Sequence, residues 1–395
     1  MRSELSVLKH IRKASARFLA ALLLCALVLP FPFSAVADRE RITSDLSSLS
    51  AKSAILIDAD SLKVLAQKDP YRQMGEASTT KIMTALAVLR RLSPDDTVKI
   101  PPEAVGIEGS SVYLCEGELL SVRDLLYALL LSSANDAATA LAIAASGSTE
   151  NFAQLMNSVA RELGALNTNF VNPHGLYDED HYTTAYDLAL ISAEALRVPL
   201  LCEIFASRKA TIPKGITADA PDGDGVRYLQ NHNKMLSLYD GAIGIKTGFT
   251  KASGRCLVSA AERDGLRLIA VTLCAPNDWH DHTLMLDYGF ENYERATIFD
   301  VGEFRYSYSV SGGNESSVVA TNAEPVVLTV RKGHQANLAE VSFPQRFELA
   351  PIEKGAVLGE LHVCADGFEM TTPLIAAYSV ERAKKSKRFK FFWQN

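Results

Sequence analysis

The hydrophobic periodicity of the chain changes near residue 297, and this change most constrains the fold. Before it, apolar residues recur at helical spacing in several segments, of which 152–163 is the clearest. After it, short alternating segments such as 305–310 are separated by turns, and the helical period disappears. The two patterns bury their apolar residues in different kinds of layer. The sequence therefore predicts a mixed α/β domain at 38–296 and a small all-β domain at 297–378.

Coarse patterns predict the main elements of the first domain. Two strands joined by a tight turn are expected at 53–59 and 63–67, and a buried hairpin at 256–274. Past Pro199 the chain is polar and irregular as far as Asn231. Helices are expected at 121–131, 135–145, 152–163 and 184–196.

Residues 1–37 have the pattern of a signal peptide. Five basic residues precede an apolar run at 18–29, and Ala35-Val-Ala37 matches a small-residue cleavage site. The apolar run is shorter than the roughly 20 residues that a stable membrane anchor needs. We therefore expect an exported protein whose mature chain begins at Asp38.

The composition excludes some classes of function. The 395 residues, 48% hydrophobic and 22% charged, suffice for two domains with a sizeable core. The formal net charge is −6, and loss of five basic residues and one acidic residue with the leader makes it −10. A chain this acidic is a poor general nucleic-acid binder. His174 and His181 lack the spacing of a zinc site, so no metal and no cofactor are expected.

Five cysteines remain after export, an odd number that cannot be fully paired. Cys256 and Cys274 flank the hairpin turn at Asp264-Gly265, but the strand register decides whether they share a face. The spacing does not resemble a disulfide framework. It favours free, buried thiols and leaves a disulfide between Cys256 and Cys274 open.

A serine and a lysine one turn apart stand at the start of an apolar helical pattern. Side chains at i and i+3 share a helix face, so the Lys81 amine can reach the Ser78 hydroxyl and take its proton. A helix that opens at Ser78 would place unpaired N–H groups beside a developing oxyanion. The alternative for Ser78 is a simple N-cap, since serine commonly opens helices.

Two further short motifs carry polar groups into apolar surroundings. Ser133-Ala-Asn135 lies between two expected helices, where a hydroxyl and an amide can point into a cleft or cap a helix. Lys246-Thr-Gly248 begins or edges a strand of a central sheet. A glycine inside a strand often marks the close approach of a ligand or another backbone, and the lysine offers a charge for a carboxylate.

Together these motifs form a specific set. On an exported acidic chain, Ser78-Thr-Thr-Lys81, Ser133-Ala-Asn135 and Lys246-Thr-Gly248 in this order resemble the active-site motifs of penicillin-binding proteins and serine β-lactamases. The surrounding sequence is similar to the low-molecular-mass serine-type D-alanyl-D-alanine carboxypeptidases of peptidase family S11. The narrower resemblance is carried by Phe170-Val-Asn-Pro-His-Gly-Leu176, Tyr182-Thr-Thr-Ala185, Asn231-His-Asn233 and Gly244-Ile-Lys-Thr-Gly-Phe-Thr250.

The resemblance implies a fold and a set of roles. The fold is a transpeptidase/β-lactamase-like α/β catalytic domain, an antiparallel sheet flanked by helices, followed by a small β-sandwich domain. Ser78 is the nucleophile, Lys81 the base and Ser133 the residue that passes the proton to the departing amine. Asn135 holds the substrate backbone. Substrate binding also involves Lys246, Thr247, Gly248, Phe249 and Thr250, with the N–H groups of Ser78 and Phe249 as the oxyanion hole.

The implied activity is penicillin-sensitive removal of the terminal D-alanine from peptidoglycan stem pentapeptides. Transpeptidation or endopeptidase action ranks second and β-lactamase action third, because no Glu-x-x-Leu-Asn pattern occurs between 146 and 240. A non-catalytic wall-peptide binder on the same fold is the alternative of a different class. Two departures stand out: Glu76 replaces a common proline, and the segment Asn277-Asp-Trp-His-Asp-His282 lacks an arginine that many members use for the substrate carboxylate.

The last residues, 379–395, form a basic and aromatic tail. Residues 381–395 have a side-chain net charge of +5, and four aromatic residues stand near the end. Such a segment suits the interface of an anionic membrane. We therefore expect the tail to attach the enzyme to the outer face of the cytoplasmic membrane, in the periplasm or wall space. The expected partners are the stem peptide, β-lactams as covalent inhibitors and this membrane surface.

Overall fold

The computed structural model describes residues 48–215, 225–333 and 338–384. The expected signal peptide and all of the tail beyond Lys384 lie outside the described residues. Among the described residues, no helix is long and apolar enough to cross a membrane.

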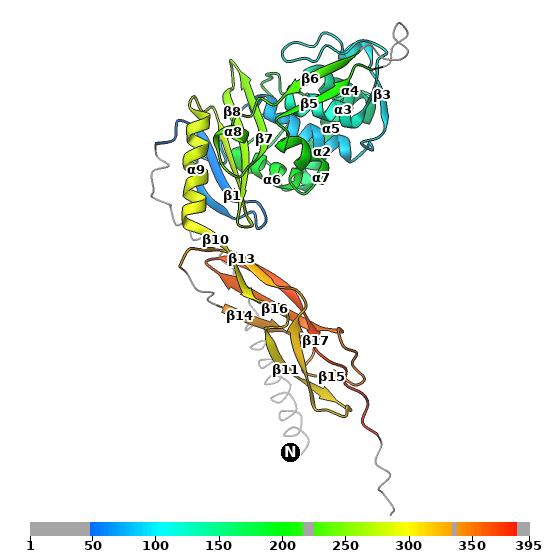
Figure 1. Cartoon of the computed structure of the whole chain (residues 1–395), viewed down its shortest axis with the longest axis vertical. Coiled ribbons are helices and arrows are strands. Elements are labelled where there is room, and N and C mark those ends of the chain that lie inside the picture. The colour runs from blue at the N-terminus through cyan, green and yellow to red at the C-terminus, as the bar shows by residue number, and fades with distance from the viewer. Residues whose placement is uncertain (1–47, 216–224, 334–337, 385–395) are drawn as a thin grey trace, which may run out of the picture. The chain divides into compact units, whose positions relative to one another are not determined.

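A five-stranded antiparallel sheet forms the centre of the first domain, in the order β2-β1-β9-β8-β7 (Figure 1). The predicted strand pair and the predicted hairpin are both present in it. β7 occupies one edge of the sheet, as the sequence allows for Lys246-Thr-Gly248. The bounds are β1 Ser53–Asp58, β2 Val64–Lys68, β7 Ala242–Thr250, β8 Gly254–Arg263 and β9 Leu266–Leu273.

Helices cover both faces of this sheet. α9 packs on one face against β9, β8 and β1, while α6 packs on the other face (Figure 1). The four predicted helices are present, and their serine or threonine N-caps accept backbone N–H groups in α3, α5 and α6. The bounds are α2 Lys81–Leu89, α3 Val122–Leu131, α4 Asn135–Ser146, α5 Thr149–Glu162, α6 Ala185–Ala195, α7 Pro199–Ala206, α8 Met235–Leu238 and α9 Asp278–Asn292.

The segment after Pro199 is more regular than the sequence indicates. α7 begins at Pro199, and Leu201, Ile204 and Phe205 bury one side of it. Proline is favoured at the first position of a helix, so reading it as a break was wrong. Two small antiparallel pairs and two 3₁₀ turns complete the domain: β3 Thr97–Lys99 with β4 Leu119–Ser121, β5 Lys209–Pro213 with β6 Val226–Gln230, η2 Ala77–Thr80 and η3 Pro102–Ala104.

The C-terminal part is all β, as predicted. A six-stranded sheet has the order β14-β16-β17-β12-β11-β15, and β10 pairs with β13. The ring of Tyr293 on β10 meets the ring of Phe368 on β17 edge-on, so side chains of the two sheets pack together. The bounds are β10 Tyr293–Phe299, β11 Arg305–Ser311, β12 Ser317–Asn322, β13 Val326–Arg331, β14 Leu338–Ser342, β15 Glu348–Leu349, β16 Val357–Ala365 and β17 Phe368–Ala376.

The cysteines of the described residues are free. Cys256 is buried on β8 and directs its thiol to the carbonyl oxygen of Gly75 at 3.7 Å. Burial raises the pKa of the Cys256 thiol to about 12. The thiol is therefore protonated at neutral pH and fills core space as a small apolar side chain.

Candidate active site

Ser78 lies in the 3₁₀ turn η2 and not at the start of an α-helix as expected, because α2 begins at Lys81. Ala77, just before it, has a φ of +52°, a left-handed conformation that few residues other than glycine adopt. β7 passes directly against this turn. A Cβ added at Gly248 would lie 3.0 Å from the Ser78 nitrogen, so glycine is needed there for strand and turn to approach each other.

Lys81 contacts Ser78 and two further oxygens. Its Nζ lies 2.9 Å from Ser78 Oγ, 2.7 Å from Asn135 Oδ1 and 2.7 Å from the carbonyl oxygen of His174. The side chain is fully buried. A neutral amine has two hydrogens and one lone pair. The Asn135 and His174 oxygens can only accept, so they take the two hydrogens and leave the lone pair for the Ser78 hydroxyl proton.

The charge state of Lys81 follows from its surroundings. Burial lowers its pKa well below the ordinary value, the positive charge of Lys246 lowers it further, and Asp136 opposes both effects. Both effects favour the neutral amine over the ammonium form. The arrangement therefore provides a base in contact with a hydroxyl nucleophile.

The His174 carbonyl was not anticipated from the sequence. It belongs to a loop in which Asn172 Oδ1 accepts the Gly175 N–H at 2.7 Å, and the Thr84 hydroxyl donates to the Pro173 carbonyl at 2.6 Å. Gly175 has a φ of +83°, and a Cβ there would lie 1.9 Å from the Ala77 carbonyl oxygen. The glycine thus lets this loop lie against the turn that holds Ser78.

Ser133 and Asn135 lie where α3 and α4 meet. Ser133 is buried with a φ of +57°, and its hydroxyl makes no hydrogen bond within the described part of the chain. Asn135 donates from Nδ2 to the Glu108 carbonyl at 2.5 Å, and its backbone N–H donates to the Ser110 carbonyl at 2.7 Å. The structure thus brings Asn135 to Lys81, whose amine also contacts Ser78, and among the described residues no hydrogen bond joins Ser133 to Lys81 or Ser78.

The β7 motif contributes a second buried lysine. Lys246 is 1% exposed, and burial lowers its pKa to about 7. Its ammonium donates to the Thr247 carbonyl at 3.0 Å. Phe249 is 64% exposed, and the hydroxyl oxygen of Thr250 accepts the Ser253 N–H at 2.9 Å. The half-buried Thr250 and the exposed Phe249 therefore lie on the same strand as Lys246. The positive charge of Lys246 lowers the pKa of Lys81.

Comparison with known proteins gives the family. The profile described as D-alanyl-D-alanine carboxypeptidase, peptidase family S11, matches residues 39–277. The chain belongs to this family. A second profile, the C-terminal domain of penicillin-binding protein 5, matches residues 293–382.

Relatives in the S11 family match over most of their length. The D-alanyl-D-alanine carboxypeptidase DacF of Bacillus subtilis is 33% identical, over 91% of this chain and 93% of its own. DacC of Escherichia coli is 31% identical, over 89% of each chain. The crystal structure of penicillin binding protein 5 from Haemophilus influenzae has a TM-score of 0.68 and 28% identity, covering 85% of this chain and 98% of that one.

A buried carboxylate behind this S11 site was missed by sequence reasoning. Asp136, next to Asn135, accepts the Ser111 hydroxyl at 2.6 Å and the backbone N–H of Leu114 at 3.0 Å. It thereby holds the loop whose carbonyls bind Asn135. An acid inside an apolar helix, directly after a motif, was the available signal, because buried carboxylates require hydrogen-bond donors.

The departure at Glu76 also has a structural partner. Glu76 is fully buried, and its Oε1 lies 2.9 Å from His181 Nε2. Thr80, on the same turn as Ser78, directs its hydroxyl to Glu76 Oε1 at 3.1 Å. This chain therefore fixes the turn that holds Ser78 through a Glu76–His181 contact.

Proposed function

We propose that Ser78 is the nucleophile of a serine D-Ala-D-Ala carboxypeptidase that removes the terminal D-alanine from peptidoglycan stem pentapeptides. The observation that carries this proposal is the contact of Ser78 Oγ with the buried Lys81 amine at 2.9 Å. Family membership supports the reaction and the substrate class.

Acylation begins with proton transfer from the Ser78 hydroxyl to the neutral Lys81 amine. Oγ attacks the carbonyl of the penultimate D-alanine, and the backbone N–H groups of Ser78 and Phe249 receive the oxyanion. The packing of Gly248 against the Ser78 turn supports this pairing of donors. Ser133 passes the proton from Lys81 to the departing amine, and the C–N bond breaks as D-alanine leaves.

Deacylation uses the same groups with water in place of D-alanine. Lys81, neutral again, takes a proton from water, whose oxygen attacks the ester carbon, and Lys81 returns that proton to Ser78 Oγ as the ester C–O bond breaks. The terminal carboxylate of the substrate binds to Lys246, Thr247 and Thr250. Asn135 holds the backbone amide of the substrate. β-Lactams, which present a strained amide to Ser78, stop at the acyl stage.

We also propose the location of the enzyme. The leader pattern at 1–37 supports export, and the basic, aromatic tail supports attachment to the outer face of the cytoplasmic membrane. Both segments lie outside the described residues, apart from the start of the tail at 379–384.

Labelled penicillin tests the nucleophile. The wild-type protein should take up one label covalently, a folded Ser78→Ala variant should take up none, and Ser61→Ala, a change at an exposed serine, should label normally. Labelling of Ser78→Ala at the wild-type rate would show that another residue is acylated. Mass spectrometry of a pentapeptide substrate should then show loss of a single alanine, whereas a new cross-link would indicate transpeptidation.

A further inference from the structure

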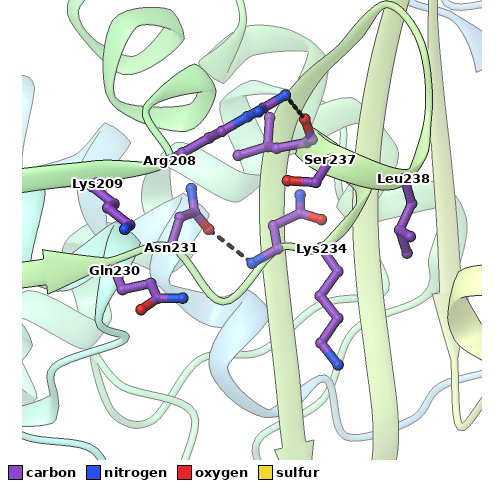
Figure 2. A pocket seen from close by; sticks show the side chains of 9 residues that line it. Arg208, Lys209, Gln230, Asn231, Lys234, Ser237 and Leu238 are labelled. Carbon is purple, nitrogen blue, oxygen red and sulfur yellow. Dashed lines mark hydrogen bonds between the residues drawn. The ribbon is translucent and has the colours of Figure 1, made fainter.

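A hollow lies beside the segment that leads into β7. Its volume is about 310 Å³, and it is formed between the start of β5, the end of β6 and the residues around α8 (Figure 2). Lys209 and Gln230, opposite each other in the β5–β6 pair, lie on one side of the turn that carries Asn231. Lys234 lies on the other side of that turn. None of the groups to which we assign catalysis or substrate binding lines this hollow.

The hollow is rich in donors and has no acidic lining residue. Arg208, Lys209 and Lys234 are its charged residues. Arg208 is already oriented, because its guanidinium donates to the Leu236 carbonyl (Figure 2). The ammonium groups of Lys209 and Lys234 are exposed and have no ion-pair partner among the described residues. On a chain with a net charge of −6, three cations without an acid form a local site of positive potential.

A buried amide, that of Asn233, borders the hollow. Asn233 is 3% exposed, and its Nδ2 has no hydrogen-bond partner within the described residues. Its other groups are used: the backbone N–H donates to Asn231 Oδ1 at 2.9 Å, and Oδ1 accepts the Met235 N–H at 3.0 Å. The amide is therefore fixed in orientation. A buried donor without an acceptor costs free energy, and an oxyanion in the hollow would satisfy it.

The hollow is lined by the chain segment that leads from β6 through α8 to β7, the strand that carries Lys246. His232 stands in the chain between Asn231 and Asn233, both of which line the hollow. Partial burial and then the positive charge of Lys246 lower the pKa of His232. This places His232 within electrostatic reach of Lys246. Within this short turn, Asn231 and Asn233 line the hollow. His232, between them, is influenced by the charge of Lys246, to which we assign substrate binding.

We propose that this hollow binds a carboxylate of the wall peptide other than the terminal one. The inference rests on the proposed function, because a stem peptide has an acidic residue whose free carboxylate can occupy a site of this kind. The ligand chemistry follows from the lining: ammonium groups at the rim and an amide N–H₂ on the wall match an oxyanion. Its volume exceeds that of a single carboxylate, so part of the acidic side chain enters with it.

The experiment compares two pentapeptide substrates that differ only in whether the acidic side-chain carboxylate is free or amidated. The variant Lys209→Gln/Lys234→Gln should raise KM for the free carboxylate about fivefold, as expected for solvated charge pairs. It should leave kcat and the KM of the amidated peptide unchanged. Asn233→Asp keeps the acceptor for Met235 but replaces the free donor by a negative charge, and it should abolish the preference for the carboxylate.

Controls separate this effect from bulk charge and from failure of the proposed activity. Lys52→Gln/Lys354→Gln, at exposed lysines elsewhere, makes the same change in net charge and should leave both KM values unchanged. Equal effects of the test variant on both peptides, or a matching effect of the control variant, would overturn the inference. Calorimetric binding of the two tetrapeptide products needs no turnover. If the wild type cleaves neither peptide, the proposed activity fails, and equal affinity for the two products would separately refute the pocket.

Discussion

Two buried lysines, to which we assign different tasks, give the candidate site its electrostatic character. Lys81 must be neutral to accept a proton, whereas Lys246 must be charged to attract a carboxylate. Burial lowers both pKa values, and the charge on Lys246 lowers that of Lys81 further. The pair therefore loses its protons in two coupled steps, and the working state lies between them.

This predicts a bell-shaped pH profile of kcat/KM for a pentapeptide. Activity should rise with pH as Lys81 loses its proton, and fall above about 7 as Lys246 loses its charge. A substrate whose terminal carboxylate is amidated should lack the alkaline limb, because it does not need the Lys246 charge. An alkaline limb of equal size with the amidated substrate would show that Lys246 does not read the carboxylate.

The base can be tested separately from the charge. Lys81→Arg keeps a cation but cannot deprotonate at neutral pH, so the variant should be nearly inactive in penicillin labelling. Circular dichroism should show that it is folded. Substantial labelling would assign the base role to another group.

The same burial makes Lys246 a cost to stability. Its folded pKa of about 7 lies below the unfolded value of 10.5, so the unfolded chain binds more protons between these pH values and the wild type gains stability as pH rises through them. Lys246→Met should therefore raise the melting temperature at pH 7, with a smaller gain at pH 9.5. A gain that grows with pH would contradict this sign.

At the scale of residues, the sequence predicted the contact between Ser78 and Lys81 but not the His174 carbonyl that shares the Lys81 amine. Ser78 and Lys81 could be paired because helical spacing places i and i+3 together. The His174 carbonyl could not be predicted, because it depends on the path of a loop that Gly175 allows to approach Ala77. Backbone oxygens carry no residue-specific pattern in a sequence.

At the scale of elements, the loop at 108–115 is held by a buried ion pair. Arg227 on β6 contacts Glu118 through both terminal nitrogens, and it donates from Nε to the Val112 carbonyl at 2.9 Å. Glu118 is 2% exposed in its side chain and Arg227 is 10% exposed. The same loop binds Asn135, so this pair connects the β5–β6 hairpin to the candidate site.

Removing one partner of the pair should lower the free energy of unfolding more than neutralising both partners does. Arg227→Met leaves a buried carboxylate, and it should lower the free energy of unfolding by roughly 3 kcal/mol. Adding Glu118→Gln, which keeps an acceptor for the Gly215 N–H, should restore part of that loss. Urea denaturation measures both effects. A double variant no more stable than Arg227→Met would mean that the loss arises elsewhere, for example from the Val112 contact.

Arg227→Met should also slow acylation, because Asn135 loses a fixed neighbour.

Elements with a strong period were predictable, and short ones were not. The apolar stripe at 152–163 produced α5, and the Asp264-Gly265 turn produced the β8–β9 hairpin. α7 was missed because Pro199 can either end a helix or begin one. The 3₁₀ turn around Ser78 was missed because nothing in a serine followed by threonines distinguishes it from the first turn of an α-helix.

At the scale of the whole molecule, the structure refines where the tail can be cut. Val380 is fully buried and pairs with Ile352, and the Ala383 N–H donates to the Gly312 carbonyl at 2.9 Å. These residues pack as part of the β domain. Removal of residues 380–384 would therefore damage that domain. Removal of 385–395 takes away four basic and four aromatic residues, and none of these contacts is lost with them.

Truncation after Lys384 should abolish co-sedimentation with anionic lipid vesicles and leave cleavage of a soluble pentapeptide unchanged. Each Lys or Arg near such a surface contributes about 1 kcal/mol, so the loss should be large at low salt. Neutral vesicles serve as the control and should bind the full chain weakly. Undiminished binding of the truncated protein to anionic vesicles would place the attachment elsewhere.

The position of β7 at the edge of the central sheet has a further consequence for solubility. Unpaired edge strands recruit strands from other molecules and thereby seed aggregates. In this protein η2, α7 and α8 pack along β7, and a Cβ at Gly248 would lie 3.0 Å from the Ser78 nitrogen of η2. A bulky residue at Gly248 would separate the turn from the strand. Such a variant should not merely lose acylation. It should precipitate, because the surface that closes the edge of the sheet is the same turn that presents Ser78.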